Sequence, residues 1–279
     1  MKKEDVKMMT KSEEQTYAAS LQGTPLSSWE IGKRFLAMSD RTLLIFEPTG
    51  FNTDISDSIT GKTLYFEGTE SRLKPDLQEE CVILFSDDGQ TLRYPTGKPT
   101  SKAMKEIDSS KLPLMSDITL IDEWRNKING KTLWTKSNLW YDGNGDRLEG
   151  QKFAKVTVID VIPTTGDFPM KVRISRQDGP DAYIQMNYTS DMYDSRNFAS
   201  LFYLTDPKAR YPQISEENWR LIQDGKVGLG MTKEECKLSL GNPDELRSGH
   251  SQSQLMDIWQ YANGTYLRFT DGLLTSFRQ

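Results

Sequence analysis

Histidine and cysteine are scarce in this chain, and their scarcity excludes several kinds of active site. His250 is the one histidine in 279 residues, and the polar stretch Ser248–Gln254 around it predicts a loop. A Ser-His-Asp or Cys-His mechanism would rest on this residue alone, so we expect no catalytic residue of that kind. Cys81 and Cys236 lie too far apart for a zinc cluster, and no metal site is predicted. The sequence leaves open whether these thiols are bonded to each other or buried as small apolar side chains.

Long hydrophobic runs and an excess of positive charge are also missing. Lys and Arg total 35 against 40 Asp and Glu, giving a net charge of -5. This balance argues against nucleic acid as a partner, because phosphate binding requires a concentrated positive field. No window approaches the ~20 apolar residues of a transmembrane segment, so none is expected. No cofactor is predicted either, since Gly61-Lys62-Thr63 lacks the earlier glycine of a phosphate-binding loop.

Residues 1–24 are polar, lack an apolar h-region and predict a tether rather than a secretory signal. Two histories fit this N-terminus. The protein is cytoplasmic, or it is an exported product whose leader was trimmed, which would place it in the periplasm or anchor it at the outer membrane. Membrane attachment is expected only in the second case.

Residues 25–110 show the short apolar runs and turn signals of a first small β module. Lys33–Met38 and Arg41–Phe46 predict a hairpin around Ser39-Asp40, and Lys98–Lys102 predicts a linker. Further strands are expected at Thr63–Phe66, Cys81–Phe85 and Thr91–Tyr94, with a turn at Asp87–Gly89.

Residues 111–205 repeat this plan and predict a second, related β module. Ser116-Asp117 predicts the start of a short helix that ends near Gly130. The segment Ile59–Tyr65 reappears as Ile128–Trp134, each with a Gly-Lys pair ahead of an apolar strand. Strands are expected at Lys131–Thr135, Phe153–Ile162, Lys171–Ser175 and Ala182–Tyr188, with a turn at Gln177–Pro180. Both modules resemble SH3-like barrels.

Residues 206–279 carry the clearest local signals and predict an α-α-β-β-β unit. Ser215 is expected to cap one helix that stops near Gly225, and Thr232 to open a second with a capping box to Glu235. Leu240-Gly241-Asn242-Pro243 ends that helix. Turns at Asn263-Gly264 and Asp271-Gly272 separate three expected strands, Asp257–Ala262, Thr265–Thr270 and Leu273–Arg278.

Three motifs of this last unit occur together: the run Gly225–Cys236 with its Gly-Met-Thr helix start, the Leu240–Pro243 helix end and the Trp259-Gln260-Tyr261 strand. With these motifs the unit resembles the SmpA/OmlA (BamE-like) family. The resemblance implies the BamE-like fold and, since family members are lipoproteins that support assembly of outer-membrane β-barrels, a cell-envelope role. The chain lacks the family's lipobox cysteine and adds two β modules. As a whole it also looks like an uncharacterised exported protein of Bacteroidetes.

The expected fold class is therefore α+β and mostly β, with two small SH3-like modules followed by a BamE-like domain. Three functions are compatible with it. The first is a non-enzymatic binding or envelope-assembly protein that acts through protein–protein contacts, and a lipoprotein is one form that it can take. The others are a carboxylate-based hydrolase of glycan or cell-wall substrates and an inhibitor-type enzyme binder, which would need an exposed aromatic sheet face. The first is preferred, because no convergent catalytic set stands out.

The final sheet offers a candidate surface for a protein partner. Two-residue turns at Asn263-Gly264 and Asp271-Gly272 would pair Tyr261 with Tyr266 and Trp259 with Arg268. Alternation then gathers five residues on one face: Trp259, Tyr261, Tyr266, Arg268 and Phe277. Both faces would be apolar, so the face not covered by helices is expected to lie against the preceding module or to bind a partner.

Overall fold

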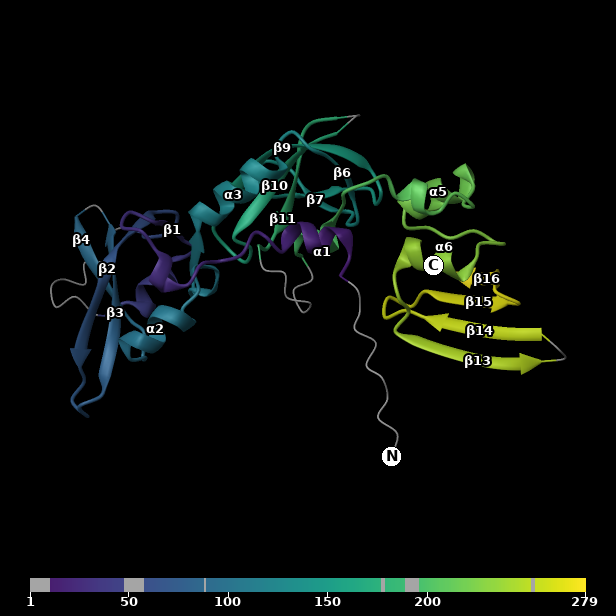
Figure 1. Cartoon of the computed structure of the whole chain (residues 1–279). Coiled ribbons are helices and arrows are strands. Elements are labelled where there is room, and N and C mark those ends of the chain that lie inside the picture. The colour runs from purple at the N-terminus through teal and green to yellow at the C-terminus, as the bar shows by residue number, and fades with distance from the viewer. Residues whose placement is uncertain (1–10, 48–57, 88, 177–178, 189–195, 252–253) are drawn as a thin grey trace. The chain divides into compact units, whose positions relative to one another are not determined.

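Three antiparallel sheets make up most of the fold, which is α+β and mostly β (Figure 1). The computed structural model describes residues 11–47, 58–87, 89–176, 179–188, 196–251 and 254–279. The chain divides into two compact units, each built from several segments. The first comprises Met1–Thr132, Trp140–Leu148 and Thr157–Phe202, and the second Leu133–Leu139, Glu149–Val156 and Tyr203–Gln279.

The first sheet has five strands in the order β4-β3-β2-β1-β5. Their bounds are β1 Arg34–Ala37, β2 Thr63–Leu73, β3 Glu79–Asp87, β4 Gln90–Pro95 and β5 Met115–Asp117. Aromatic and aliphatic side chains from alternate strand positions form its core, in which Phe35, Leu64 and Phe85 are fully buried. Helix α2 (Thr100–Glu106) adds Ala103 to this core, and the short 3-10 helices η1 (Leu26–Ser28) and η3 (Ser109–Lys111) lie in the same unit.

Two expectations for this region are wrong. Arg41–Phe46 does not pair as a hairpin strand, because Asp40–Ile45 forms the 3-10 helix η2. At its start the Ser39 N–H donates to Thr42 Oγ1 (3.5 Å) and the Thr42 N–H donates to Ser39 O (2.9 Å), while the Thr42 hydroxyl donates to Leu114 O (2.9 Å). The linker predicted at Lys98–Lys102 runs into α2, whose first residue is Thr100. Of the predicted turn Asp87–Gly89, residue 88 lies outside the described residues.

The tether predicted for residues 1–24 is wrong where the structure describes it; residues 1–10 lie outside the described part. Helix α1 (Glu13–Ala18) begins at Ser12 with a capping box to Gln15. The Tyr17 ring stacks on Phe198 of α4 (Phe198–Leu201) at 5.4 Å, and its hydroxyl donates to Lys127 O. Ala18 and, after the helix, Leu21 are buried. Although this segment is mostly polar, it forms a short helix whose apolar side packs against other residues of the first unit.

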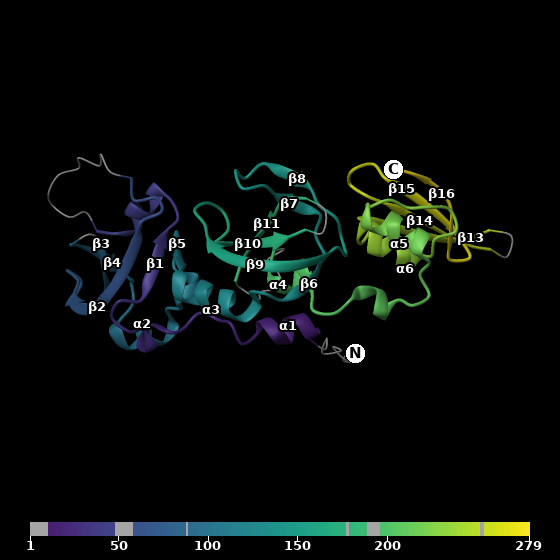
Figure 2. The same cartoon turned by 90° about the horizontal axis from the view of Figure 1, so that it is seen from above.

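The second sheet has seven strands in the order β12-β6-β9-β10-β11-β7-β8 (Figure 2). Their bounds are β6 Thr132–Thr135, β7 Leu139–Tyr141, β8 Arg147–Glu149, β9 Lys155–Pro163, β10 Met170–Ser175, β11 Ala182–Met186 and β12 Phe202–Tyr203. Helix α3 (Ile118–Ile128) precedes it and is capped by Asp117, as the sequence predicts. Of the expected turn Gln177–Pro180, residues 177–178 lie outside the described part.

The repeated Ile-x-Gly-Lys segments adopt the same local turn. Gly61 and Gly130 have φ values of 81° and 75°, which glycine adopts without steric cost. In each turn the lysine N–H donates to the isoleucine carbonyl three residues earlier, at 3.0 Å. Ile59 and Ile128 are both buried. The sequence echo therefore corresponds to one way of starting a strand, used twice.

The third sheet belongs to the second unit and has four strands in the order β13-β14-β15-β16. The elements of this part are η4 Pro207–Arg210, α5 Glu216–Gln223, α6 Lys233–Leu240, β13 Glu245–Ser251, β14 Gln254–Gln260, β15 Tyr266–Thr270 and β16 Leu273–Arg278. Both predicted caps are present, with Ser215 accepting from Asn218 N and Thr232 forming a capping box with Glu235. Residues of α5, α6 and one sheet face share a core that includes Trp219, Cys236 and Leu267.

Strand β13 is an addition to the three strands expected here. The loop predicted at Ser248–Gln254 is wrong for residues 248–251, whose backbone pairs with β14, while 252–253 lie outside the described residues. The strand was missed because its sequence, Glu-Leu-Arg-Ser-Gly-His-Ser, has no apolar alternation. The two cysteines are free and buried, so Cys81 and Cys236 are not bonded to each other.

Candidate functional site

The loop between β14 and β15 sets the register of the third sheet, and this register differs by one residue from the predicted one. The predicted pairing of Tyr261 with Tyr266 is wrong, because the loop has three residues rather than two. The Tyr261 N–H donates to Thr265 O (3.0 Å), the Gly264 N–H donates to Tyr261 O (2.9 Å), and Gly264 has a φ of 85°. These features define a type I turn followed by a left-handed glycine. The cross-strand pairs are then Gln260 with Tyr266 and Trp259 with Leu267.

The turn at Asp271-Gly272 has two residues, as predicted, and both have a positive φ (49° and 86°). A bulge follows it on β16, because the register shifts between Arg268 and Phe269. Thr275 is the extra residue, and its hydroxyl donates to Arg268 O (3.1 Å). The bulge places Leu267 opposite Phe277 and Tyr266 opposite Arg278.

With this register, the five residues predicted for partner binding do not share a face. Trp259 is 5% exposed and packs in the core under the helices, with its ring 4.7 Å from that of Phe269. Phe277 lies on the same face at the sheet edge and is 40% exposed. Tyr266 and Arg268 lie on the opposite, outer face. Tyr261 lies in the loop, where its hydroxyl donates to Gly241 O (3.2 Å).

Tyr261 anchors the loop instead of presenting a free ring. It packs at the margin of the core and reaches the C-terminal end of α6 through its bond to Gly241. Burial, with smaller contributions from Cys236 and Asp244, raises the pKa of its phenol to about 12. The hydroxyl therefore stays a neutral donor at physiological pH.

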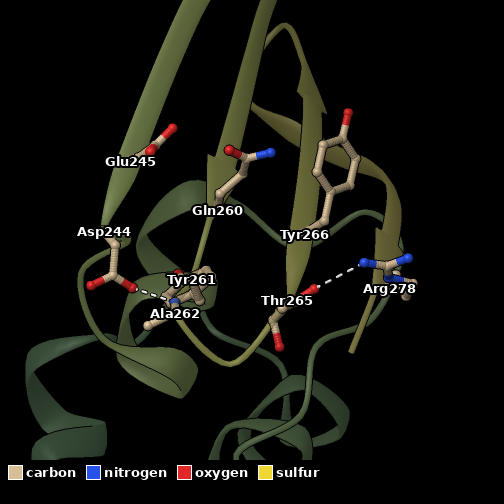
Figure 3. A pocket seen from close by; sticks show the side chains of 9 residues that line it. Asp244, Glu245, Gln260, Tyr261, Ala262, Thr265, Tyr266 and Arg278 are labelled. Atoms are coloured by element: carbon tan, nitrogen blue, oxygen red, sulfur yellow. Dashed lines mark hydrogen bonds between the residues drawn. The ribbon is translucent and has the colours of Figure 1, made fainter.

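A groove of about 500 Å³ opens on the outer face beside this loop. One cross-strand row forms its floor and contributes a residue from each of the four strands: Glu245, Gln260, Tyr266 and Arg278. Figure 3 shows these side chains side by side above the sheet. Asp244 and the loop residues Tyr261, Ala262, Gly264 and Thr265 complete the lining.

The groove carries opposite charges at its two sides. Asp244 and Glu245 lie at the β13 side, and Arg278 lies at the β16 side. The Asp244 carboxylate accepts from Ala262 N (2.6 Å), and the Arg278 guanidinium donates to Gly264 O (3.4 Å), as Figure 3 shows. Tyr266 lies between these charged sides. The arrangement suits a ligand that offers a cation, an apolar or aromatic surface and an anion in that order.

The two adjacent carboxylates of the groove differ from the acid pair of a glycan hydrolase. Asp244 and Glu245 are both exposed, Asp244 is bonded to a backbone N–H, and Glu245 pairs with Arg247 at 3.1 Å. A general acid in such enzymes is held in a desolvated, apolar setting. Elsewhere among the described residues, no group of three His, Cys, Asp or Glu side chains is placed to hold a metal ion.

A second row of the outer face continues the polar surface beyond the groove. It comprises Arg247, Ile258, Arg268 and Ser276. Arg247 and Arg268 are exposed, and Ile258 is half-buried. Sequence reasoning missed Glu245, Gln260 and Arg278, because they follow from β13 and from the one-residue change in register. A three-residue reading of the Asn-Gly loop would have placed Gln260 beside Tyr266.

None of the described helices has the length and apolar character needed to cross a membrane. Comparisons with models of protein families, with curated proteins and with solved structures find no match to this chain.

Proposed function

We propose that this chain is a non-enzymatic binding protein that holds a protein partner on the outer face of its third sheet. One observation carries the proposal: the described helices of the second unit, α5 and α6, pack on the other face of this sheet, and the groove on the outer face combines Tyr266 with charges of both signs. Tyr and Arg are enriched at protein interfaces because each offers a large contact area together with polar groups. The preferred ligand is an extended protein segment that carries a basic and an acidic side chain on either side of an apolar one.

The finer identity of the protein is part of the same proposal. The third sheet with its two helices is a BamE-like domain, supported by the caps at Thr232 and Gly241 and by the helix–helix–sheet order. The two preceding sheets are SH3-like modules, supported by their shared Gly-Lys turns. On these resemblances the partner is a protein of the cell envelope. An inhibitor-type enzyme binder would use the same face.

Affinity purification of the full chain from its source cells, followed by mass spectrometry, tests this proposal. The double variant Tyr266→Ala/Arg278→Ala removes the centre and the basic side of the groove, and we expect it to lose the proteins that the wild type enriches. Arg220→Ala, an exposed arginine on α5, is the matched control and should retain them. Equal enrichment by the double variant would show that the partner binds elsewhere. A loss of the partner's own enzymatic activity on binding would favour the inhibitor role over assembly.

A further inference from the structure

Strand β13 forms one edge of the third sheet (Figure 1), and its outer side carries no backbone partner in the described part of the chain. The opposite edge differs. There Gly230 N–H donates to Leu274 O and Leu274 N–H donates to Met231 O, both at 2.8 Å, so the segment before α6 covers β16. An uncovered edge can pair with another strand, and proteins usually block it with charged side chains, proline or a bulge. Glu245–Ser251 contains no lysine, proline or bulge, and its two charged side chains, Glu245 and Arg247, have opposite signs.

The hydrogen-bond alternation shows which backbone groups of β13 point outward. The Tyr261 N–H bonds to the carbonyl of Thr265, the residue just before β15, so the backbone groups of odd-numbered residues on β14 point toward β15 and those of even-numbered residues point toward β13. The bond from Asp244 N–H to Gln260 O agrees with this assignment. The even-numbered residues of β14 pair with four residues of β13: Glu245, Arg247, Gly249 and Ser251. The N–H and C=O groups of Leu246 and Ser248 therefore point away from the sheet.

The side chains near this edge are complementary to themselves. If two copies of β13 pair antiparallel about Leu246, each Leu246 lies opposite the other, and each Glu245 lies opposite an Arg247 of the second copy. The outward backbone groups of Leu246 suit this register, since residues at the centre exchange both hydrogen bonds. Leu246 is 58% exposed, and the side chains of Glu245 and Arg247 are 60% and 71% exposed. These two side chains pair with each other at 3.1 Å within one chain, and the dimer exchanges that pair for two pairs between chains. Directly opposite residues have Cβ atoms about 4.5–5.5 Å apart, close enough for the charges to pair.

We propose that β13 is a self-association edge, at which a second copy of this chain adds its own β13 and joins two four-stranded sheets into one of eight strands. The self-complementary charges favour a second copy over an unrelated strand. A contact made by one strand pair is small, so the dimer forms in a concentration-dependent equilibrium. This inference does not depend on the groove having a partner, because the readout is the mass of the purified chain alone.

Sedimentation equilibrium of the full chain over a range of concentrations tests the proposal. Glu245→Arg and Arg247→Glu each place like charges opposite one another twice, and we expect each to raise the dimer Kd by roughly tenfold or more. An equimolar mixture of the two variants restores opposite charges at both positions, as does the double swap in one chain. We expect both to associate within about threefold of the wild-type Kd, on the same reasoning.

Glu217→Arg and Arg220→Glu, exposed residues of α5, are controls with the same charge changes and should leave the Kd unchanged. A wild-type chain that stays monomeric at every concentration overturns the proposal. So does a dimer that either single variant leaves intact, or a mixture that associates no better than its components. Misfolding cannot imitate the expected result, because two variants that had lost the strand would not recover association on mixing.

Discussion

At the scale of single residues, Thr232 supports α6 with a reciprocal pair of hydrogen bonds. Its hydroxyl accepts from Glu235 N (3.2 Å), while the Glu235 carboxylate accepts from Thr232 N (2.7 Å). Thr232→Ala leaves the Glu235 N–H without this partner, and we expect the free energy of unfolding to fall by about 0.5–2 kcal/mol. Chemical denaturation measures the change. Thr232→Ser keeps the hydroxyl and should recover most of it, so equal losses in both variants would contradict the capping role.

Tyr188 is expected to make the free energy of unfolding of the first unit vary with pH in the alkaline range. Burial raises the pKa of its phenol from 10.0 to about 12. The phenol ionises first in the unfolded chain, so the contribution of Tyr188 to stability is constant below pH 10, is lost between pH 10 and 12, and does not change further above that range. A shift of this size corresponds to at most about 2–3 kcal/mol.

Tyr188→Phe removes this ionisation. We expect the variant to lose less of its free energy of unfolding than the wild type between pH 10 and 12, measured by urea denaturation at several pH values. The difference between the two proteins at pH 7, where the phenol is neutral in both states, is the reference. If the free energies of unfolding of the wild type and Tyr188→Phe fell in parallel with pH, Tyr188 would be accessible to solvent when ionised.

At the scale of elements, Gly23 holds the segment after α1 against the turn before β5. A Cβ added at Gly23 would lie 1.8 Å from the Asp108 carboxylate and 2.6 Å from Ser110 N. Gly23→Ala must therefore shift the backbone beside Leu26, whose N–H donates to Ile107 O (2.8 Å). We expect a loss of about 1–3 kcal/mol, as for other overpacked sites.

Hydrogen exchange measures this effect locally, and the Leu26 amide should exchange faster in Gly23→Ala. Gly249→Ala is the matched control, because its added Cβ meets nothing within 4 Å and its φ is not positive. If Leu26 kept its protection in Gly23→Ala, the close approach seen in the structure would not exist in solution.

Elements whose ends are fixed locally could be predicted from the sequence. Ser215 and Thr232 cap their helices through bonds that span three residues, and those signals were sufficient. Elements fixed by distant contacts could not. Helix η2 depends on a bond from Thr42 to Leu114, 72 residues away, and α1 depends on a ring contact with Phe198.

The candidate surface was predicted in its location but not in its composition. Alternation on β14 and β15 was read correctly, yet an Asn-Gly pair fits both two-residue and three-residue loops, and a change of one residue moves side chains to the other face. Trp259 thereby moved into the core while Tyr266 stayed on the outer face. Arg278 became part of the groove only through the bulge on β16.

At the scale of the whole molecule, the third sheet is not built from residues 206–279 alone. Phe153, from the segment between β8 and β9, is 7% exposed and belongs to the core beneath that sheet. Its ring stacks on Tyr203 at 5.7 Å and meets the edge of Trp219 at 5.5 Å. The second unit accordingly includes Glu149–Val156. The domain boundary at residue 206 was predicted from helix caps and turns, and these local signals carry no information about a long-range aromatic contact.

Phe153→Ala in the full chain tests this composition of the second unit. Removing a buried phenylalanine ring costs about 3–5 kcal/mol, and we expect a loss of that order in the transition that exposes Trp219 and Trp259, followed by tryptophan fluorescence in urea. Phe153→Leu keeps most of the apolar volume and should lose less. A fragment of residues 206–279 lacks Phe153 altogether and should unfold at a lower urea concentration than a fragment of residues 133–279. The longer fragment supplies Phe153 together with the strands that position it. Equal urea midpoints for the two fragments would therefore mean that the C-terminal core is complete without the Phe153 ring.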